Sequence, residues 1–163
     1  MKKILIALAL FSSLSVSANQ DAEVLGVAFG STCEETVQKL NKDYGTPKSQ
    51  SADKLVYLNE MFEGFKADRV ELGFQDLQGT TKLNQARFYF VCSNKAAAIA
   101  RMKSLVKKME TRYSVSYDEE DGGTAFYKGG NSPLGIGCLF TIFVSPYQGK
   151  WTCQLRYGKF QFK

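Results

Sequence analysis

The sequence predicts an α+β fold in which two helix-plus-three-strand repeats form one antiparallel sheet, with both helices packed on one face. A helix pattern followed by three strand patterns occurs twice, over residues 23–92 and 93–163. No linker rich in Pro, Gly or Ser divides the copies, so we expect them to be halves of a single domain, residues 19–163. The aromatic content of 13% favours a sheet-rich core.

Residues 1–18 have the pattern of a cleavable secretory signal. Lys2 and Lys3 precede an apolar run, residues 4–14, which is shorter than the ~20 residues that a permanent membrane anchor needs. We expect cleavage near Ala18 and a bacterial protein that is periplasmic or secreted, without a stable membrane anchor. The alternatives are an uncleaved anchor or a hydrophobic first strand.

The first predicted helix spans about residues 32–44. Ser31 with Glu34, or Thr32 with Glu35, can form a capping box at its start. Three strands are predicted to follow, at residues 55–62, 69–75 and 85–92. In the second and third of these strands, alternate apolar side chains are predicted to share a face: Val70, Leu72, Phe74, Ala86, Phe88, Phe90 and Cys92.

The second predicted helix begins after a cap at Ser93-Asn94 and reaches about Tyr113. Apolar residues occupy one arc of this helix, and the rest carries Arg101, Lys108 and Arg112. The basic side is interpreted as a solvated face, with docking of an acidic partner as the alternative. Strands are predicted at residues 115–117 with 124–128, at 138–144 and at 151–162.

An even set of four cysteines predicts two disulfides in a chain sent to an oxidising compartment. A turn at residues 145–149, folded as a hairpin, is expected to place Cys138 opposite Cys153, which leaves Cys33 to pair with Cys92. A zinc site is disfavoured because no Cys-x-x-Cys pair and no histidine is present. No metal or other cofactor is predicted.

The charge balance disfavours a nucleic-acid partner. Without Lys2 and Lys3, the 21 basic residues fall to 19 against 16 acidic ones, a net charge of +3. Nucleic-acid binders usually have a larger basic excess, gathered in a patch.

The composition also limits catalysis. The absence of histidine excludes Ser-His-Asp and Cys-His mechanisms, and the expected disulfides would consume the thiols. A hydrolase that uses carboxylates alone stays open, with its acids drawn from Glu34, Glu35, Glu60, Glu63, Glu71 and the run Asp118–Asp121. That acidic run is interpreted as a solvated hairpin loop, with a calcium loop as the alternative.

Two loops are the predicted recognition surfaces. The first, residues 129–137, is rich in glycine but has neither the following helix nor the Lys-Ser/Thr of a phosphate-binding loop, so a nucleotide site is disfavoured. A plain hairpin connection is its other interpretation. The second loop covers residues 145–151. The candidate partner-binding residues of the two loops are Asn131, Leu134, Ile136, Tyr147 and Trp151, although strand parity also makes Trp151 a core candidate.

Some residues of the first repeat resemble a known family of periplasmic modules. Leu25-Gly26, Gly30-Ser31-Thr32, Val37, Leu40 and Gly45-Thr46-Pro47 are similar to the start of the helix-and-three-strand module of the outer-membrane assembly lipoproteins, although the lipid-accepting cysteine of that family is missing. The doubled layout with two disulfides is similar to that of beta-lactamase inhibitory protein. Both resemblances imply a protein that binds other proteins without turning over a substrate.

The favoured hypothesis is therefore a non-enzymatic module that binds another envelope or secreted protein, as an inhibitor or an immunity-type protein. A second hypothesis is a periplasmic carrier of a small apolar ligand held by Phe74, Phe88, Phe90 and Phe140. The carboxylate-only hydrolase is the third.

Overall fold

A computed structural model describes residues 22–120 and 124–163 of the chain. The predicted signal peptide, residues 1–18, lies outside the described residues. Neither helix in the described part has the length and apolar character needed to cross a membrane.

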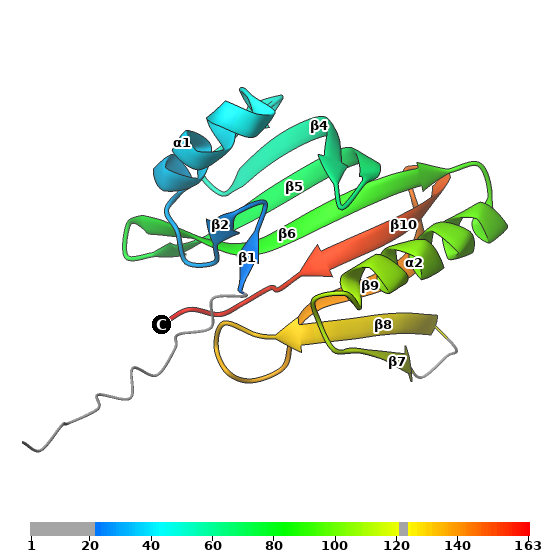
Figure 1. Cartoon of the computed structure of the whole chain (residues 1–163). Helices are drawn as coiled ribbons and strands as arrows, with labels where there is room; N and C mark the ends of the chain where they lie inside the picture. The colour runs from blue at the N-terminus through cyan, green and yellow to red at the C-terminus, as the bar shows by residue number, and fades with distance from the viewer. Residues whose placement is uncertain (1–21, 121–123) are drawn as a thin grey trace, which may run out of the picture.

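The described residues form two helices and ten strands (Figure 1). Helix α1 spans Cys33–Tyr44 and α2 spans Lys95–Met109. Two short strands, β1 (Glu23–Val24) and β2 (Val27–Ala28), pair with each other. The other eight strands form one antiparallel sheet: β3 (Ser49–Gln50), β4 (Lys54–Phe62), β5 (Phe65–Leu77), β6 (Thr80–Cys92), β7 (Val115–Glu120), β8 (Thr124–Asn131), β9 (Cys138–Tyr147) and β10 (Lys150–Tyr157).

The order of the sheet is β3-β4-β5-β6-β10-β9-β8-β7. Strands β3 to β6 follow α1 in the chain, and β7 to β10 follow α2. The two sets meet where β6 pairs with β10, from Ala86 opposite Tyr157 to Cys92 opposite Trp151. The centre of the sheet is therefore built from segments that lie far apart in the sequence.

This architecture corrects the predicted fold class. The described chain is mostly β, with 52% strand and 20% helix, and its repeats are not helix-plus-three-strand units. Each helix is followed by four strands, because residues 115–120 and 124–131 are separate strands and the short β3 precedes β4. The predictions for β5 and β6 were too short, since both strands continue to a tight turn at Gln78-Gly79. The prediction of a strand at residues 151–162 was too long, since β10 ends at Tyr157.

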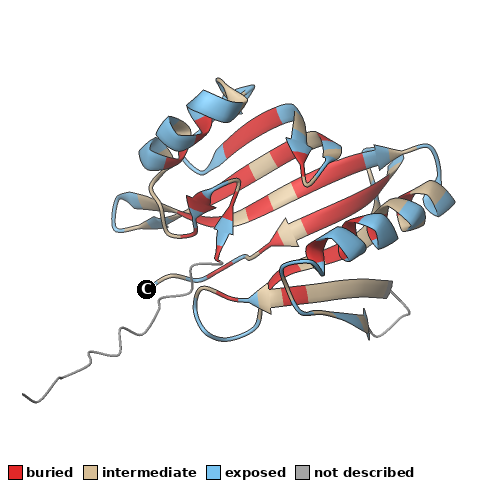
Figure 2. Cartoon of the chain, in the orientation of Figure 1, coloured by how far each residue is buried: buried red, intermediate tan, exposed pale blue. Residues whose placement is uncertain are grey.

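Both helices pack on the same face of the sheet, where one hydrophobic core contains residues from all the long strands. Leu40 of α1 and Leu105 and Met109 of α2 are at most 1% exposed in this core. The sheet contributes the alternating side chains predicted for β5 and β6, together with Leu155 and Ile142 from β10 and β9. Figure 2 shows buried segments running along the central strands and exposed residues on the outer sides of the helices.

The starts of both helices follow the predicted caps. Thr32 accepts a hydrogen bond from the backbone N–H of Glu35, and the Glu35 carboxylate accepts one from the backbone N–H of Thr32, which completes the capping box. The Asn94 side chain accepts from the backbone N–H of Ala97 at the start of α2. Of the two capping boxes considered, the Thr32–Glu35 box is the one that forms.

The predicted disulfides are absent, because the thiols of Cys33, Cys92, Cys138 and Cys153 are all free. The turn between β9 and β10 is Gln148-Gly149, since Tyr147 pairs with Lys150. This register places Val144 opposite Cys153, so Cys138 lies six residues further along β9. At about 3.4 Å per residue, the two cysteines are roughly 20 Å apart along the strand. Pairing of Cys138 with Cys153 would need a turn centred three residues earlier than the observed one.

Candidate partner-binding surface

The face of the sheet that points away from the helices carries two long rows of side chains. Residues directly opposite each other on paired strands point to the same face. The first row, from β4 to β7, is Leu58, Arg69, Tyr89, Gln154, Phe143, Phe126 and Asp118. The second row is Val56, Glu71, Arg87, Arg156, Thr141, Lys128 and Ser116. We call these two rows, with the adjoining Tyr147, the open face.

The open face combines aromatic rings with an excess of positive charge. Its two rows carry four cations against two carboxylates, which are those of Glu71 and Asp118. Across seven strands the rows extend for roughly 30 Å. A surface of this extent suits another macromolecule better than a small ligand.

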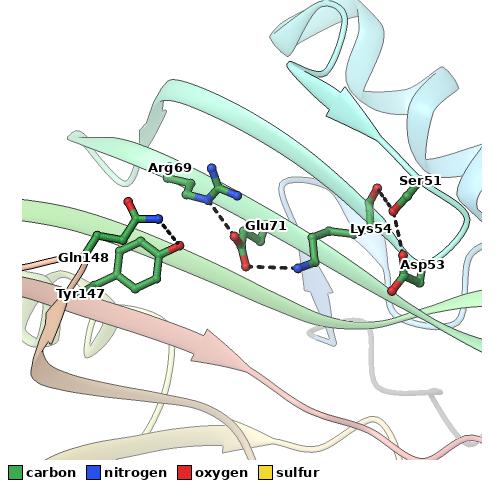
Figure 3. A network of polar contacts seen from close by, with 7 residues as sticks. All are labelled: Ser51, Asp53, Lys54, Arg69, Glu71, Tyr147 and Gln148. Atoms are coloured by element: carbon green, nitrogen blue, oxygen red, sulfur yellow. Dashed lines mark hydrogen bonds and ion pairs between the residues drawn. The ribbon is translucent and has the colours of Figure 1, made fainter.

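Both carboxylates of the open face are engaged by cations. Glu71 accepts a hydrogen bond from Nε of Arg69 at 2.7 Å, and Nζ of Lys54 lies 4.0 Å from its other oxygen (Figure 3). The Glu71 side chain is only 12% exposed, so this pair is partly shielded from water. Asp118 forms an ion pair with Lys128, whose ammonium group holds the pKa of that carboxyl below its usual range.

The aromatic side chains of the open face are held by their neighbours. The ring of Tyr147, beside the β9–β10 turn, lies against the ring of Tyr89 in the middle of β6. The guanidinium of Arg156 lies 5.0 Å from the centre of the Phe143 ring, a cation–π distance. Burial, and then the nearby carboxylate of Glu71, raises the pKa of the Tyr89 phenol.

The structure separates the two loops that were predicted to bind the partner. In the first loop, Asn131, Leu134 and Ile136 are exposed, Ile136 at 87%. In the second loop, Tyr147 is half-buried against Tyr89. The ten-residue strand β9 lies between the loops, so they occupy opposite ends of the sheet. Only Tyr147, among these candidates, joins the open face.

Trp151 lies on the helix side of the sheet, as its strand parity predicted. It is half-buried, and Nζ of Lys95 from α2 lies 5.5 Å from its ring centre. A hollow of about 880 Å³ is lined by residues from both faces of the sheet. Trp151 lines this hollow from the helix side, and Phe143 and Arg156 line it from the open face.

Three of the acidic residues considered for hydrolysis have separate structural partners. Glu35 caps α1, Glu63 is paired with Arg112, and Glu71 with Arg69. Residues 118–120 belong to the edge strand β7, so the interpretation of the acidic run as a loop was wrong for them. Its last residue, Asp121, lies outside the described residues. Among the described residues, no group of three or more Cys, Asp or Glu side chains could hold a metal ion.

The four rings considered for an apolar carrier are part of the hydrophobic core. Phe88 and Phe140 are at most 1% exposed, and each contacts Tyr157 at ring distances of 6.1 and 5.7 Å. Phe74 and Phe90 belong to the same core. These rings pack against other side chains of the chain itself.

Sequence reasoning missed most of the open face. Arg69, Arg87 and Arg156 lie at alternate positions of strands whose apolar residues were correctly assigned to the core. The alternation therefore contained a signal, because the polar side of each strand held arginine and aromatic residues. Strand order and register were needed to bring those residues together.

No protein-family model, no curated protein and no solved structure matches this chain. The resemblances to the outer-membrane assembly lipoproteins and to beta-lactamase inhibitory protein therefore stay predictions.

Proposed function

We propose that this protein is an exported, non-catalytic module that binds a partner protein through its open face, as an inhibitor or an immunity-type protein. The observation that carries the proposal is the asymmetry of the sheet: one face is filled by two helices, and the other presents arginine and aromatic side chains in two rows. Arginine and tyrosine are among the residues that contribute most to binding at protein interfaces.

Rigidity supports the same proposal. The open face lies on the long paired strands β5, β6, β10 and β9 rather than on loops, and its side chains already contact one another. A surface that is ordered before binding loses less conformational entropy when the partner arrives. Such a surface would be sufficient to bind an enzyme of the cell envelope and block access to its active site.

The test compares partner capture by matched variants of the mature chain, residues 19–163. Immobilised wild-type protein, a double variant of the open face (Phe143→Ser with Tyr147→Ser) and a control variant of the outer side of α2 (Lys103→Ser with Lys107→Ser) are exposed to an extract of the cell envelope. Far-ultraviolet circular dichroism and urea unfolding first establish that all three proteins are folded.

We expect one protein to be captured by the wild type and the control and depleted at least tenfold by the open-face variant. That protein is then purified, and its affinity for the three chains is measured by calorimetry in the same order. Equal affinity for all three chains, or loss of affinity only in the α2 control, would overturn the proposal.

A further inference from the structure

Two arginines face each other at the centre of the open face. Arg87 of β6 lies directly opposite Arg156 of β10, in the strand pair that joins the two sets of strands. Side chains in directly opposed positions start from Cβ atoms only about 5 Å apart. Like charges in this arrangement repel each other, and the arrangement is the reverse of the opposite-charge pairs that stabilise sheets.

The charge of Arg87 is not neutralised within the described residues. Glu71 lies opposite Arg87 on β5, but its carboxylate is bound by Arg69 and lies near Lys54. None of the ion pairs among the described residues involves Arg87. In addition, Nε of Arg87 is buried and has no hydrogen-bond acceptor among the described residues. A buried donor without an acceptor is a feature that native proteins usually avoid.

Aromatic neighbours hold both arginines in place. Arg87 interacts with the phenol of Tyr89, two residues along the same strand, and this interaction opposes the rise that burial causes in the pKa of that phenol. Arg156 lies over the ring of Phe143. Phe143 is two residues along β9 from Thr141, which is the residue directly opposite Arg156. Planar guanidinium groups placed in this way can donate to both oxygens of a carboxylate.

We propose that Arg87 and Arg156 together bind a carboxylate side chain of an acidic segment of the partner protein. This inference rests on the proposed function and adds the chemistry of the partner. A carboxylate beside these guanidinium groups would balance the charge of Arg87, which no described ion pair neutralises. The rings of Tyr89 and Phe143 would border it on the side of the first row.

The first test uses acetylated hexaglutamate amide as the probe, with hexaglutamine amide as the uncharged control, in 0.15 M NaCl. Side-chain Nε–H resonances of the arginines are followed by NMR. We expect saturable shifts of the Arg87 and Arg156 signals with hexaglutamate only. Arg87→Gln is expected to weaken this binding at least tenfold, and the α2 variant Lys107→Gln is expected to leave it unchanged.

Three outcomes of this titration would overturn the inference. The first is the absence of saturable shifts at Arg87 and Arg156. The second is an equal loss of affinity in Arg87→Gln and Lys107→Gln, which would indicate general attraction to a basic protein. The third is binding of sodium acetate or inorganic phosphate as tight as that of hexaglutamate, which would indicate an adventitious ion only.

The second test separates this inference from the proposed function. The purified partner is titrated with the double variant Arg87→Gln with Arg156→Gln, which keeps donors but removes both charges. We expect at least a tenfold loss of affinity. The carboxylate inference would be overturned if this arginine variant bound the partner as tightly as the wild type while the variant Phe143→Ser with Tyr147→Ser lost affinity. That result would leave docking on the open face in place.

Discussion

The rings of Tyr89 and Tyr147 lie 4.3 Å apart, with their planes 31° from parallel. Tyr89 belongs to the middle of β6 and is 4% exposed, whereas Tyr147 immediately precedes the Gln148-Gly149 turn. This contact fixes the tip of the β9–β10 hairpin against a strand that pairs with β10 on its other side. The end of this hairpin is therefore part of the open face.

Removal of the Tyr147 ring is expected to destabilise the protein. Aromatic pairs contribute about 1 kcal/mol beyond the area they bury, so Tyr147→Ala is expected to lower the free energy of unfolding by at least that amount in urea titrations. Tyr147→Phe keeps the ring contact and is the matched control, with an expected change of about 0.3 kcal/mol or less. Equal stability of the Ala variant and the wild type would show that the ring contact contributes nothing.

Arginines of the open face are expected to affect stability with opposite signs. Arg87→Gln removes a repulsion with Arg156 and is expected to raise the free energy of unfolding by about 0.5 kcal/mol at low salt. Arg69→Gln removes the ion pair with Glu71 and is expected to lower it by a similar amount. In 1 M NaCl, where screening acts over about 3 Å, both differences are expected to shrink. Shifts of the same sign in both variants would contradict the charge arrangement described above.

Cys153 is expected to make stability depend on pH in the alkaline range. Burial raises the pKa of its thiol from 9.0 to about 12. Between these values the unfolded chain loses the proton while the folded chain keeps it, so the free energy of unfolding is unaffected below pH 9 and falls as the pH rises towards 12. One proton corresponds to a slope of at most about 1.4 kcal/mol per pH unit.

Urea titrations at pH 7, 9 and 10.5 measure this effect, with Cys153→Val as the comparison. The valine variant lacks the thiol, so its stability is expected to fall less between pH 9 and 10.5 than that of the wild type. Burial also raises the pKa of Tyr157, and this contribution is common to both proteins. Parallel curves for the two proteins would refute the assignment to Cys153.

The capping box of α1 gives a further prediction. Thr32→Ala removes an acceptor for the Glu35 N–H and is expected to cost about 1 kcal/mol of unfolding free energy. Thr32→Ser retains the hydroxyl oxygen and is expected to stay within about 0.3 kcal/mol of the wild type. The test fails if alanine and serine give the same stability.

Local patterns in the sequence predicted individual helices and strands better than they predicted how the strands pair in the sheet. The capping box of α1 and the alternation of Val70, Leu72 and Phe88 were correct because they depend on a residue's own helix or strand. The pairing of β6 with β10 depends on residues about 65 positions apart, as the pair Arg87 and Arg156 illustrates, and no local pattern encodes it.

A missed turn signal explains the wrong register. Gln148-Gly149 is a two-residue turn in which both residues have positive φ, 50° and 75°. Leu25-Gly26, Glu63-Gly64 and Gln78-Gly79 have the same geometry, and each joins two paired strands. A residue followed by Gly between two strand patterns was therefore the informative feature, and the first three residues of the predicted turn, 145–147, lie inside β9.

The edge strand β7 carries the acidic run, with Asp118 and Glu119 next to each other in a strand that has a neighbour on one side only. An unpaired strand edge invites backbone pairing with a second molecule, and fixed negative charges on it repel an identical edge. Substitution of these acids by neutral residues would thus leave an edge at which two copies of the chain could pair into dimers or fibres.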